Sequence, residues 1–231
     1  MKKLSGYLIL LFSIAVVAHA DIKVASIKGH VYVRRNVEEN WVRVGVGDIL
    51  KPNDSMKLEK KSSTTILIDG KRNLVIPELV ILDLSDLRTL TQEELLLKLA
   101  MEHVRNVRPE QHNGELHIPI TTTVHGRNNT LAASPSAGPS QTATLQLNGT
   151  RMLFKKGYYA TCALKTKEIV RQYPDLPNVL DAQIMIAAAL EKSKLDGEAL
   201  SEYLSIPAAK LSPKQRVIVE AKIAQLKKKS E

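Results

Sequence analysis

Apolar and polar residues alternate along the first third of the chain, from Ile22 to Leu84. In an extended strand this spacing puts every second side chain on one face, so the stretch predicts β-strands. The alternating pairs are Val31 and Val33, Val42 and Val44, Ile66 and Ile68, and Leu74 and Ile76, and the turn signals between them are Lys28-Gly29, Glu39-Asn40, Gly45 to Asp48, Pro52-Asn53-Asp54 and Asp69-Gly70. Short strands separated by such turns indicate an antiparallel sandwich or a small barrel-like domain.

A helix is predicted over residues 91–106. Thr91 and Glu94 have the spacing of a capping box, and apolar residues follow at helical spacing from Leu95. We expect this helix to pack on the β domain, which then covers residues 21–127 and includes one further strand over residues 116–124. Residues 128–144 carry no charge and are rich in serine, alanine, threonine and proline, so they predict a flexible linker.

From Leu145 onward the apolar residues recur at helical spacing, so residues 145–231 predict a helical module. Its first part resembles a tetratricopeptide helix pair through Gly157-Tyr158-Tyr159, Cys162, Ile169 and Tyr173-Pro174. A looser second unit covers residues 182–204, and a last helix is predicted over residues 213–229. Thr166 and Cys162 depart from the repeat pattern, and a generic small helical bundle is the alternative. The expected fold class is therefore α+β, with an amino-terminal β domain and a segregated carboxy-terminal helical module.

The β domain resembles the FecR-like periplasmic domain. The residues that carry this resemblance are Gly29 to Arg34, Trp41, Val44 to Leu50, Asn53 to Met56, Ser62 to Thr65, Asp69-Gly70 and Val75 to Pro77. Within them, the structural turn positions are Gly29, Trp41, Gly47, Asp48, Asp54, Asp69 and Gly70. The resemblance implies a bacterial, exported domain that serves as a binding or scaffolding module. In the iron-uptake regulators of this family such a domain receives a signal from an outer-membrane receptor.

Residues 1–20 have the layout of a secretory signal peptide. Lys2 and Lys3 precede an apolar run from Tyr7 to Val17 that is short for a membrane-spanning helix. Small residues at Ala18 and Ala20 then predict cleavage before Asp21. We therefore expect a periplasmic or otherwise exported protein that has no transmembrane segment after the signal is removed, and an uncleaved anchor is the alternative.

The formal net charge is +9, of which Lys2 and Lys3 contribute two units. A basic surface favours anionic partners, such as an anionic glycan or lipid surface, although a solvated surface that keeps the protein soluble explains the charge equally simply. Export disfavours nucleic acid as a partner. Lys227 to Lys229 are interpreted as a solvated terminus.

The sequence carries no recognisable catalytic or cofactor motif, so we expect neither an enzyme nor a cofactor. The five histidines beyond the predicted signal lack metal-ligand spacing, and no metal site is expected; they are His30, His103, His112, His117 and His125. Cys162 is the one cysteine, which rules out an intrachain disulfide and predicts a buried apolar residue. Asn128 and Asn148 each begin a glycosylation acceptor pattern in an expected loop, and we interpret both matches as coincidental.

Together these observations favour a non-enzymatic binding or scaffold protein of the cell envelope that engages another envelope protein or peptide. The expected contact residues lie on the helical module, namely Tyr158, Tyr159, Tyr173 and Tyr203, although core packing competes with this interpretation. The alternatives are a FecR-type signalling sensor retained by its amino-terminal segment and a binder of anionic glycan or peptidoglycan.

Overall fold

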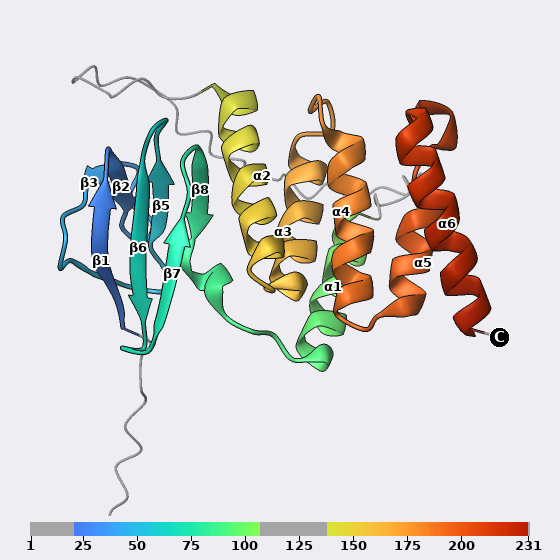
Figure 1. Cartoon of the computed structure of the whole chain (residues 1–231), viewed down its shortest axis with the longest axis horizontal. Helices are drawn as coiled ribbons and strands as arrows, with labels where there is room; N and C mark the ends of the chain where they lie inside the picture. Colours follow the sequence, from blue (N-terminus) through green and yellow to red (C-terminus); the bar gives the residue numbers. More distant parts are fainter. Residues whose placement is uncertain (1–20, 107–137, 231) are drawn as a thin grey trace, which may run out of the picture.

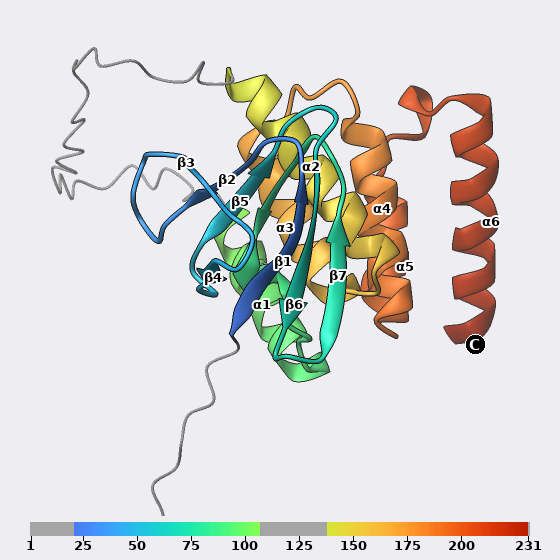
Figure 2. The same cartoon turned by 60° about the vertical axis from the view of Figure 1, so that its left-hand side comes forward.

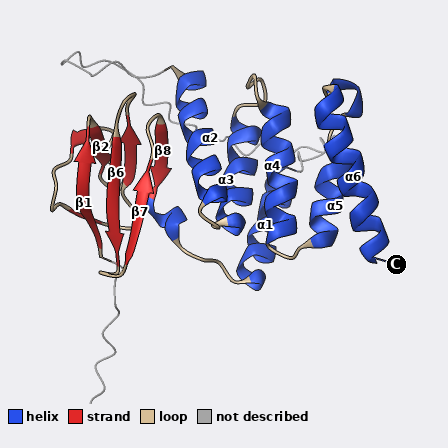
Figure 3. Ribbon diagram, viewed as in Figure 1, coloured by secondary structure: helices blue, strands red, loops and turns tan. Residues whose placement is uncertain are grey.

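The computed structural model describes residues 21–106 and 138–230, in which strands come first and helices follow (Figures 1 and 3). The strands are β1 (Ile22–Lys28), β2 (Val31–Arg34), β3 (Val42–Arg43), β4 (Ile49–Leu50), β5 (Ser55–Leu58), β6 (Ser63–Ile68), β7 (Arg72–Ile76) and β8 (Val80–Asp83). The helices are η1 (Leu84–Leu87), α1 (Gln92–Asn106), α2 (Pro139–Lys155), α3 (Tyr159–Gln172), α4 (Val179–Lys192), α5 (Asp196–Ser205), η2 (Ala208–Lys210) and α6 (Pro213–Ser230). The expected segregated α+β class is confirmed. The predicted signal, the strand expected over residues 116–124 and most of the expected linker lie outside the described residues.

The strands form two antiparallel four-stranded sheets, with the orders β4-β1-β6-β7 and β3-β2-β5-β8. We call the second one sheet B. The predicted alternation places apolar side chains between the two sheets. Val31 and Val33 of β2, Ile66 and Ile68 of β6, and Leu74 and Ile76 of β7 are all buried. Val42 is the exception among the predicted pairs, because β3 is a two-residue strand at the edge of sheet B and leaves this side chain exposed.

The turns are built by the residues that the sequence singled out. Asp69 and Gly70 both have positive φ and join β6 to β7 through a bond from the Lys71 amide to the Ile68 carbonyl, which is the geometry of a type I′ hairpin turn. Asp54 is buried and accepts a hydrogen bond from the Lys51 amide at 2.9 Å, and Asp48 accepts one from the Gly45 amide at 2.9 Å. Each aspartate thus caps its own turn.

Helix α1 begins with the predicted capping box. The Glu94 amide donates to the Thr91 hydroxyl at 3.1 Å, and the Thr91 amide donates to the Glu94 carboxylate at 3.0 Å. We expected this helix to pack on the β domain, and this prediction was wrong. Helix α1 packs against α3 of the helical module. The buried carboxylate of Glu102 meets Arg171 of α3 at 3.0 Å, a tertiary contact that the amphipathic pattern of α1 does not reveal.

Helices α2 to α6 pack in sequence order, each against the next, and extend away from the sandwich (Figures 1 and 2). Helices α2 and α4 end in the same way. The amides of Gly157 and Tyr158 bond to Phe154 and Leu153, and those of Lys194 and Leu195 bond to Glu191 and Leu190 in the same pattern. Gly157 and Lys194 both have positive φ. These are two Schellman turns at equivalent positions of a repeated helix pair. When Gly157 is aligned with Lys194, Cys162 corresponds to Ala199, and both of these small side chains are fully buried.

Helix α2 begins inside the segment that we expected to be a flexible linker. Residues 139–144 form its first turns, with Pro139 at the start, where the missing amide proton costs nothing. Composition alone misled the prediction, because Pro139 and Ser140 are favourable at a helix start as well as in a loop. The part of the expected linker before residue 138 lies outside the described residues.

Helix α2 also covers the free edge of sheet B. Strand β8 is the last strand of this sheet, and the carbonyls of Leu79, just before it, and of Ile81, within it, face the helix. The side-chain amide of Asn148 donates to the Leu79 carbonyl at 2.8 Å, and a Cβ at Gly149 would overlap the Ile81 carbonyl oxygen. The acceptor pattern that begins at Asn148 therefore lies in a helix that packs on a strand, and not in the expected loop. Covering an edge in this way prevents unwanted strand pairing.

Candidate functional site

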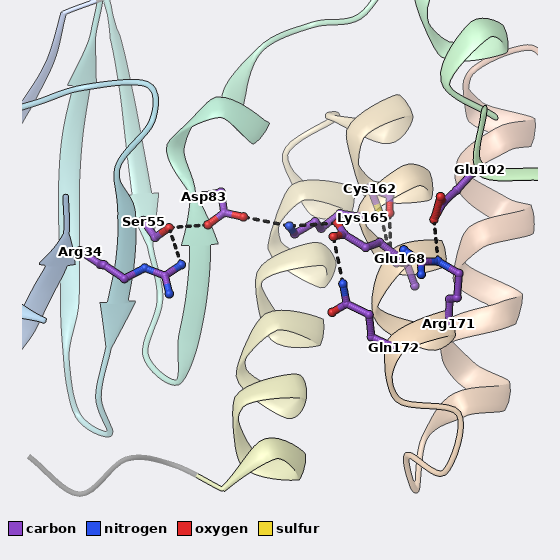
Figure 4. A network of polar contacts seen from close by, with 10 residues as sticks. Arg34, Ser55, Asp83, Glu102, Cys162, Lys165, Glu168, Arg171 and Gln172 are labelled. Atoms are coloured by element: carbon purple, nitrogen blue, oxygen red, sulfur yellow. Dashed lines mark hydrogen bonds and ion pairs between the residues drawn. The ribbon is translucent and has the colours of Figure 1, made fainter. Parts of the chain in front are cut away.

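A chain of polar contacts joins the sandwich to the helices (Figure 4). At its centre, Asp83 at the end of β8 accepts a hydrogen bond from the Ser55 hydroxyl at 2.6 Å and forms an ion pair with Lys165 of α3 at 2.9 Å. Ser55 in turn accepts a bond from the Arg34 guanidinium, and Lys165 also pairs with Glu168 at 3.2 Å. These charges fix the position of α3 relative to sheet B.

A cleft of about 440 Å³ opens beside this chain, between η1, α1 and α3. Both the segment that follows β8 and the helical module contribute to it. Its lining combines three acidic, three basic and several apolar or neutral side chains, namely Asp86, Glu102, Glu168, Arg88, Lys98, Lys165, Leu90, Met101, Leu164, Ser85 and Thr161. A concave site of this size at the junction of two modules is the usual location of a binding site.

The inner end of the cleft is acidic. Burial raises the pKa of Asp86 to about 7; the ammonium of Lys165 opposes this rise, and the carboxylates of Asp83 and Glu168 add to it. Burial alone would lower the pKa of Lys165, but Asp83, Asp86 and Glu168 together hold it above its usual value. Three carboxylates therefore act on Lys165, and Lys98 acts on Asp86 from α1. The raised pKa of Asp86 means that a further positive charge beside it would be favoured.

The polar partners of Asp83 together outweigh its desolvation. Burial by itself would raise this pKa, but the charge of Lys165, the hydrogen bond from Ser55 and the charge of Arg34 together bring it below its usual value. Asp83 is thus ionised at neutral pH and places a negative charge behind Lys165, which lines the cleft.

An apolar stripe on α1 adjoins the cleft. Leu97, Met101 and Val104 share one helix face and are 65%, 51% and 71% exposed. Met101 also lines the cleft, which makes the two features continuous. Exposed apolar side chains that form a stripe beside charged groups are typical of surfaces that bind other proteins.

The four tyrosines proposed as contact residues do not form one surface. Tyr203 is only 2% exposed and lies in the core of the helical module, where burial raises its pKa to about 12 with a further contribution from the Glu191 carboxylate. Tyr173 is half-buried and packs on a smaller apolar cluster. Tyr158 and Tyr159 are half-buried at the start of α3, where they line a second, smaller cavity. Tyr158 also receives a bond from Arg72 of the sandwich.

Cys162 is fully buried in α3. Burial raises the pKa of its thiol to about 12, and the hydrogen bond to Thr166 only partly offsets this rise. A thiol with this pKa is a poor nucleophile. Within residues 21–106 and 138–230, no three metal-ligating side chains come together, and no helix of that part is long and apolar enough to cross a membrane.

The sequence did not single out the residues that line the cleft. Asp86, Lys165 and Glu168 lie on two segments that are far apart in the chain, and their spacing within each segment is that of ordinary surface charges. Only the packing of α1 and η1 against α3 brings them together. The one available signal was the pair of aspartates at the end of a buried strand and just after it, Asp83 and Asp86.

No protein-family model, curated protein or solved structure matches this chain.

Proposed function

We propose that this protein is an exported, non-enzymatic binding or scaffold protein of the bacterial cell envelope, and that it holds another envelope protein at the cleft between η1, α1 and α3. The observation that carries the proposal is the continuity of the cleft with the exposed stripe of Leu97, Met101 and Val104. The partner segment would place apolar side chains on α1 and a lysine or arginine side chain at the acidic inner end.

The arrangement of the two modules supports this role. Their buried apolar residues belong to one continuous cluster, and α2 is seated directly on β8. The cleft lies between modules that pack on each other, and its α1 wall packs on its α3 wall; packed walls limit the entropy lost when a partner binds. In this proposal residues 22–84 are a FecR-like domain, and helices α2 to α5 are tetratricopeptide-like repeats.

A site-specific crosslinking experiment tests the proposal. A photo-crosslinking amino acid placed at Met101 in the full-length protein, expressed in its own host, should capture one reproducible envelope protein. The same group placed at Leu204, an equally exposed apolar residue on α5, serves as the matched control and should capture none of that partner. Equal capture at the two positions, or none at Met101, would contradict the proposal.

Two variants sharpen the result. Leu97→Glu adds charge to the stripe and should abolish capture at Met101, while Val217→Glu on the exposed face of α6 should leave it unchanged.

The amino terminus of this protein itself, and not that of its partner, is determined in the same preparation. A start at Asp21 supports export with cleavage, and a retained Met1 in the inner membrane favours the anchored sensor.

A further inference from the structure

The outward face of sheet B carries a row of cations. The strand register pairs Tyr32 of β2 with Arg43 on one side and with Lys57 on the other. Directly opposite residues of neighbouring strands share a face, so these three side chains form one line across the sheet. Arg34 stands two residues from Tyr32 on the same face.

Two aromatic rings hold these cations in place. The Lys57 ammonium lies 5.2 Å from the ring centroids of both Tyr32 and Trp41, and the Arg34 guanidinium lies 5.3 Å from that of Trp41. Each distance is within the range of an attractive cation–π contact. The rings therefore hold these long side chains in place before a ligand binds. Because less conformational entropy is then lost on binding, the free-energy cost of binding is lower.

The cations of this face have one carboxylate near them on the sheet, Asp83, whose pKa the charge of Arg34 helps to lower. Among the described residues, Arg34, Arg43 and Lys57 form no ion pair. Asp83 is the one carboxylate at an outward position of sheet B, and its ion pair is with Lys165. Arg34 also keeps a buried Nε that has no hydrogen-bond partner in the described structure.

The helices leave this part of sheet B open. They pack at the β8 end of the sheet, away from β3 (Figure 2). Ile81 on β8 is buried there, whereas Arg43 on β3 is exposed and Tyr32 and Lys57 are half-exposed. We name the face formed by Tyr32, Arg34, Trp41, Arg43 and Lys57 the cationic strip. It lies on different elements from the cleft and does not depend on the proposed protein partner.

We propose that the cationic strip binds an acidic polysaccharide, with Arg43, Lys57 and Arg34 contacting successive carboxylate or phosphate groups and the exposed ring edges of Trp41 and Tyr32 contacting sugar rings. Charge complementarity selects an anion, and the open arrangement of the cations over three neighbouring strands selects an extended polymer. Both rings are half-buried and already contact cations, which disfavours them as platforms for stacking nucleic-acid bases.

Affinity electrophoresis of the full chain tests the proposal. Gels contain polygalacturonate as the carboxylate polymer, teichoic acid as the phosphate polymer, or neutral dextran. We expect retardation by at least one acidic polymer and none by dextran. The Arg43→Gln/Lys57→Gln variant should bind that polymer at least tenfold more weakly. A matched control, Lys210→Gln/Lys214→Gln, removes the same charge from exposed positions at η2 and α6 and should bind as the wild type does.

Three results would overturn the proposal. Equal weakening by the control pair would show a general effect of net charge. Retardation by dextran, or by neither acidic polymer, would exclude recognition of acidic sugar polymers. Strip-dependent binding to phosphatidylglycerol vesicles or to a single-stranded oligonucleotide with higher affinity than to either polymer would assign the strip to a different partner. Thermal unfolding of each variant checks that the fold is intact.

Discussion

Lys165 of α3 and Asp83 at the end of β8 form an ion pair of 2.9 Å that joins the helical module to the sandwich. Both side chains are largely buried, and each holds the pKa of the other away from its usual value in the direction that favours its charged form. The pair thus contributes to the stability of the junction and, through the charge that it retains, to the acidity of the neighbouring cleft.

Replacing Lys165 by methionine should weaken the junction. The variant leaves Asp83 buried without its cation, and we expect the free energy of unfolding to fall by about 1–3 kcal/mol. The effect should be full near pH 7 and should shrink as the pH falls below the usual aspartate pKa of 3.8, because protonated Asp83 no longer needs a cation. This loss is measured by urea unfolding, followed both by Trp41 fluorescence and by the circular dichroism signal of the helices.

Lys222→Met is the matched control for that experiment. It removes a comparable ion pair with Glu191, which joins α6 to α4 inside the helical module. The junction interpretation predicts that only Lys165→Met makes the Trp41 transition, which reports the sandwich, depart from the helical transition. Coincident transitions in both variants would show that the ion pair has no special part in coupling the modules.

Asp86→Asn should stabilise the protein at alkaline pH. The folded-state pKa of Asp86 is raised to about 7, so the folded chain binds this proton more tightly than the unfolded chain does. Wild-type stability therefore falls as the pH rises from about 4 to 7, and the variant avoids this loss. The expected gain is about 1–2 kcal/mol above pH 7 and close to zero at pH 4, reduced from the full shift because the side chain is partly exposed.

Stability curves of wild type and Asp86→Asn across this pH range measure the difference. A gain in the free energy of unfolding that is independent of pH would contradict the raised pKa of Asp86. Glu93→Gln provides the comparison, because the pKa of this exposed carboxylate on α1 is shifted in the opposite direction, lowered by a backbone hydrogen bond and the Thr91 side chain.

Gly149→Ala should separate α2 from β8. A Cβ at this position would overlap the Ile81 carbonyl oxygen, so the helix or the strand has to move. Overpacking of this kind costs about 1–3 kcal/mol, partly offset by the better helix propensity of alanine. Gly197→Ala in α5 is the control, since nothing lies within 4 Å of its added methyl group, and it should leave stability unchanged or raise it by up to about 1 kcal/mol. Thermal unfolding distinguishes the two variants, and a neutral Gly149→Ala would show that the close approach is unnecessary.

Cys162 should react with thiol reagents only when the helices open. The thiol is fully buried, and its pKa is raised to about 12. At pH 8 we expect labelling by a maleimide to be slower than that of a model thiol by a factor of at least about 100. Addition of urea up to the unfolding transition should restore the fast rate. Fast labelling of the native protein would contradict the burial.

The turns and strands of the sandwich were predictable because each depends on local chemistry. Asp69-Gly70 adopts its turn through backbone conformations that only such residues reach easily, and Asp54 bonds to an amide three residues away. The same holds for the Thr91 and Glu94 capping box. The start of α2 was not predictable in this way, because its first residues, Pro139 and Ser140, suit a loop as well as the first turn of a helix.

The sequence by itself determined the order of the elements, the alternating core of the sandwich and the segregation of strands from helices, because these follow from periodicity and turn residues over short spans. Only the tertiary structure decided that α1 packs on α3, that Asn148 and Gly149 cover the edge of β8, and that Asp86 and Lys165 share a cleft. These relationships depend on which faces meet across the chain, and the energies that select them come from burial and desolvation in the assembled fold.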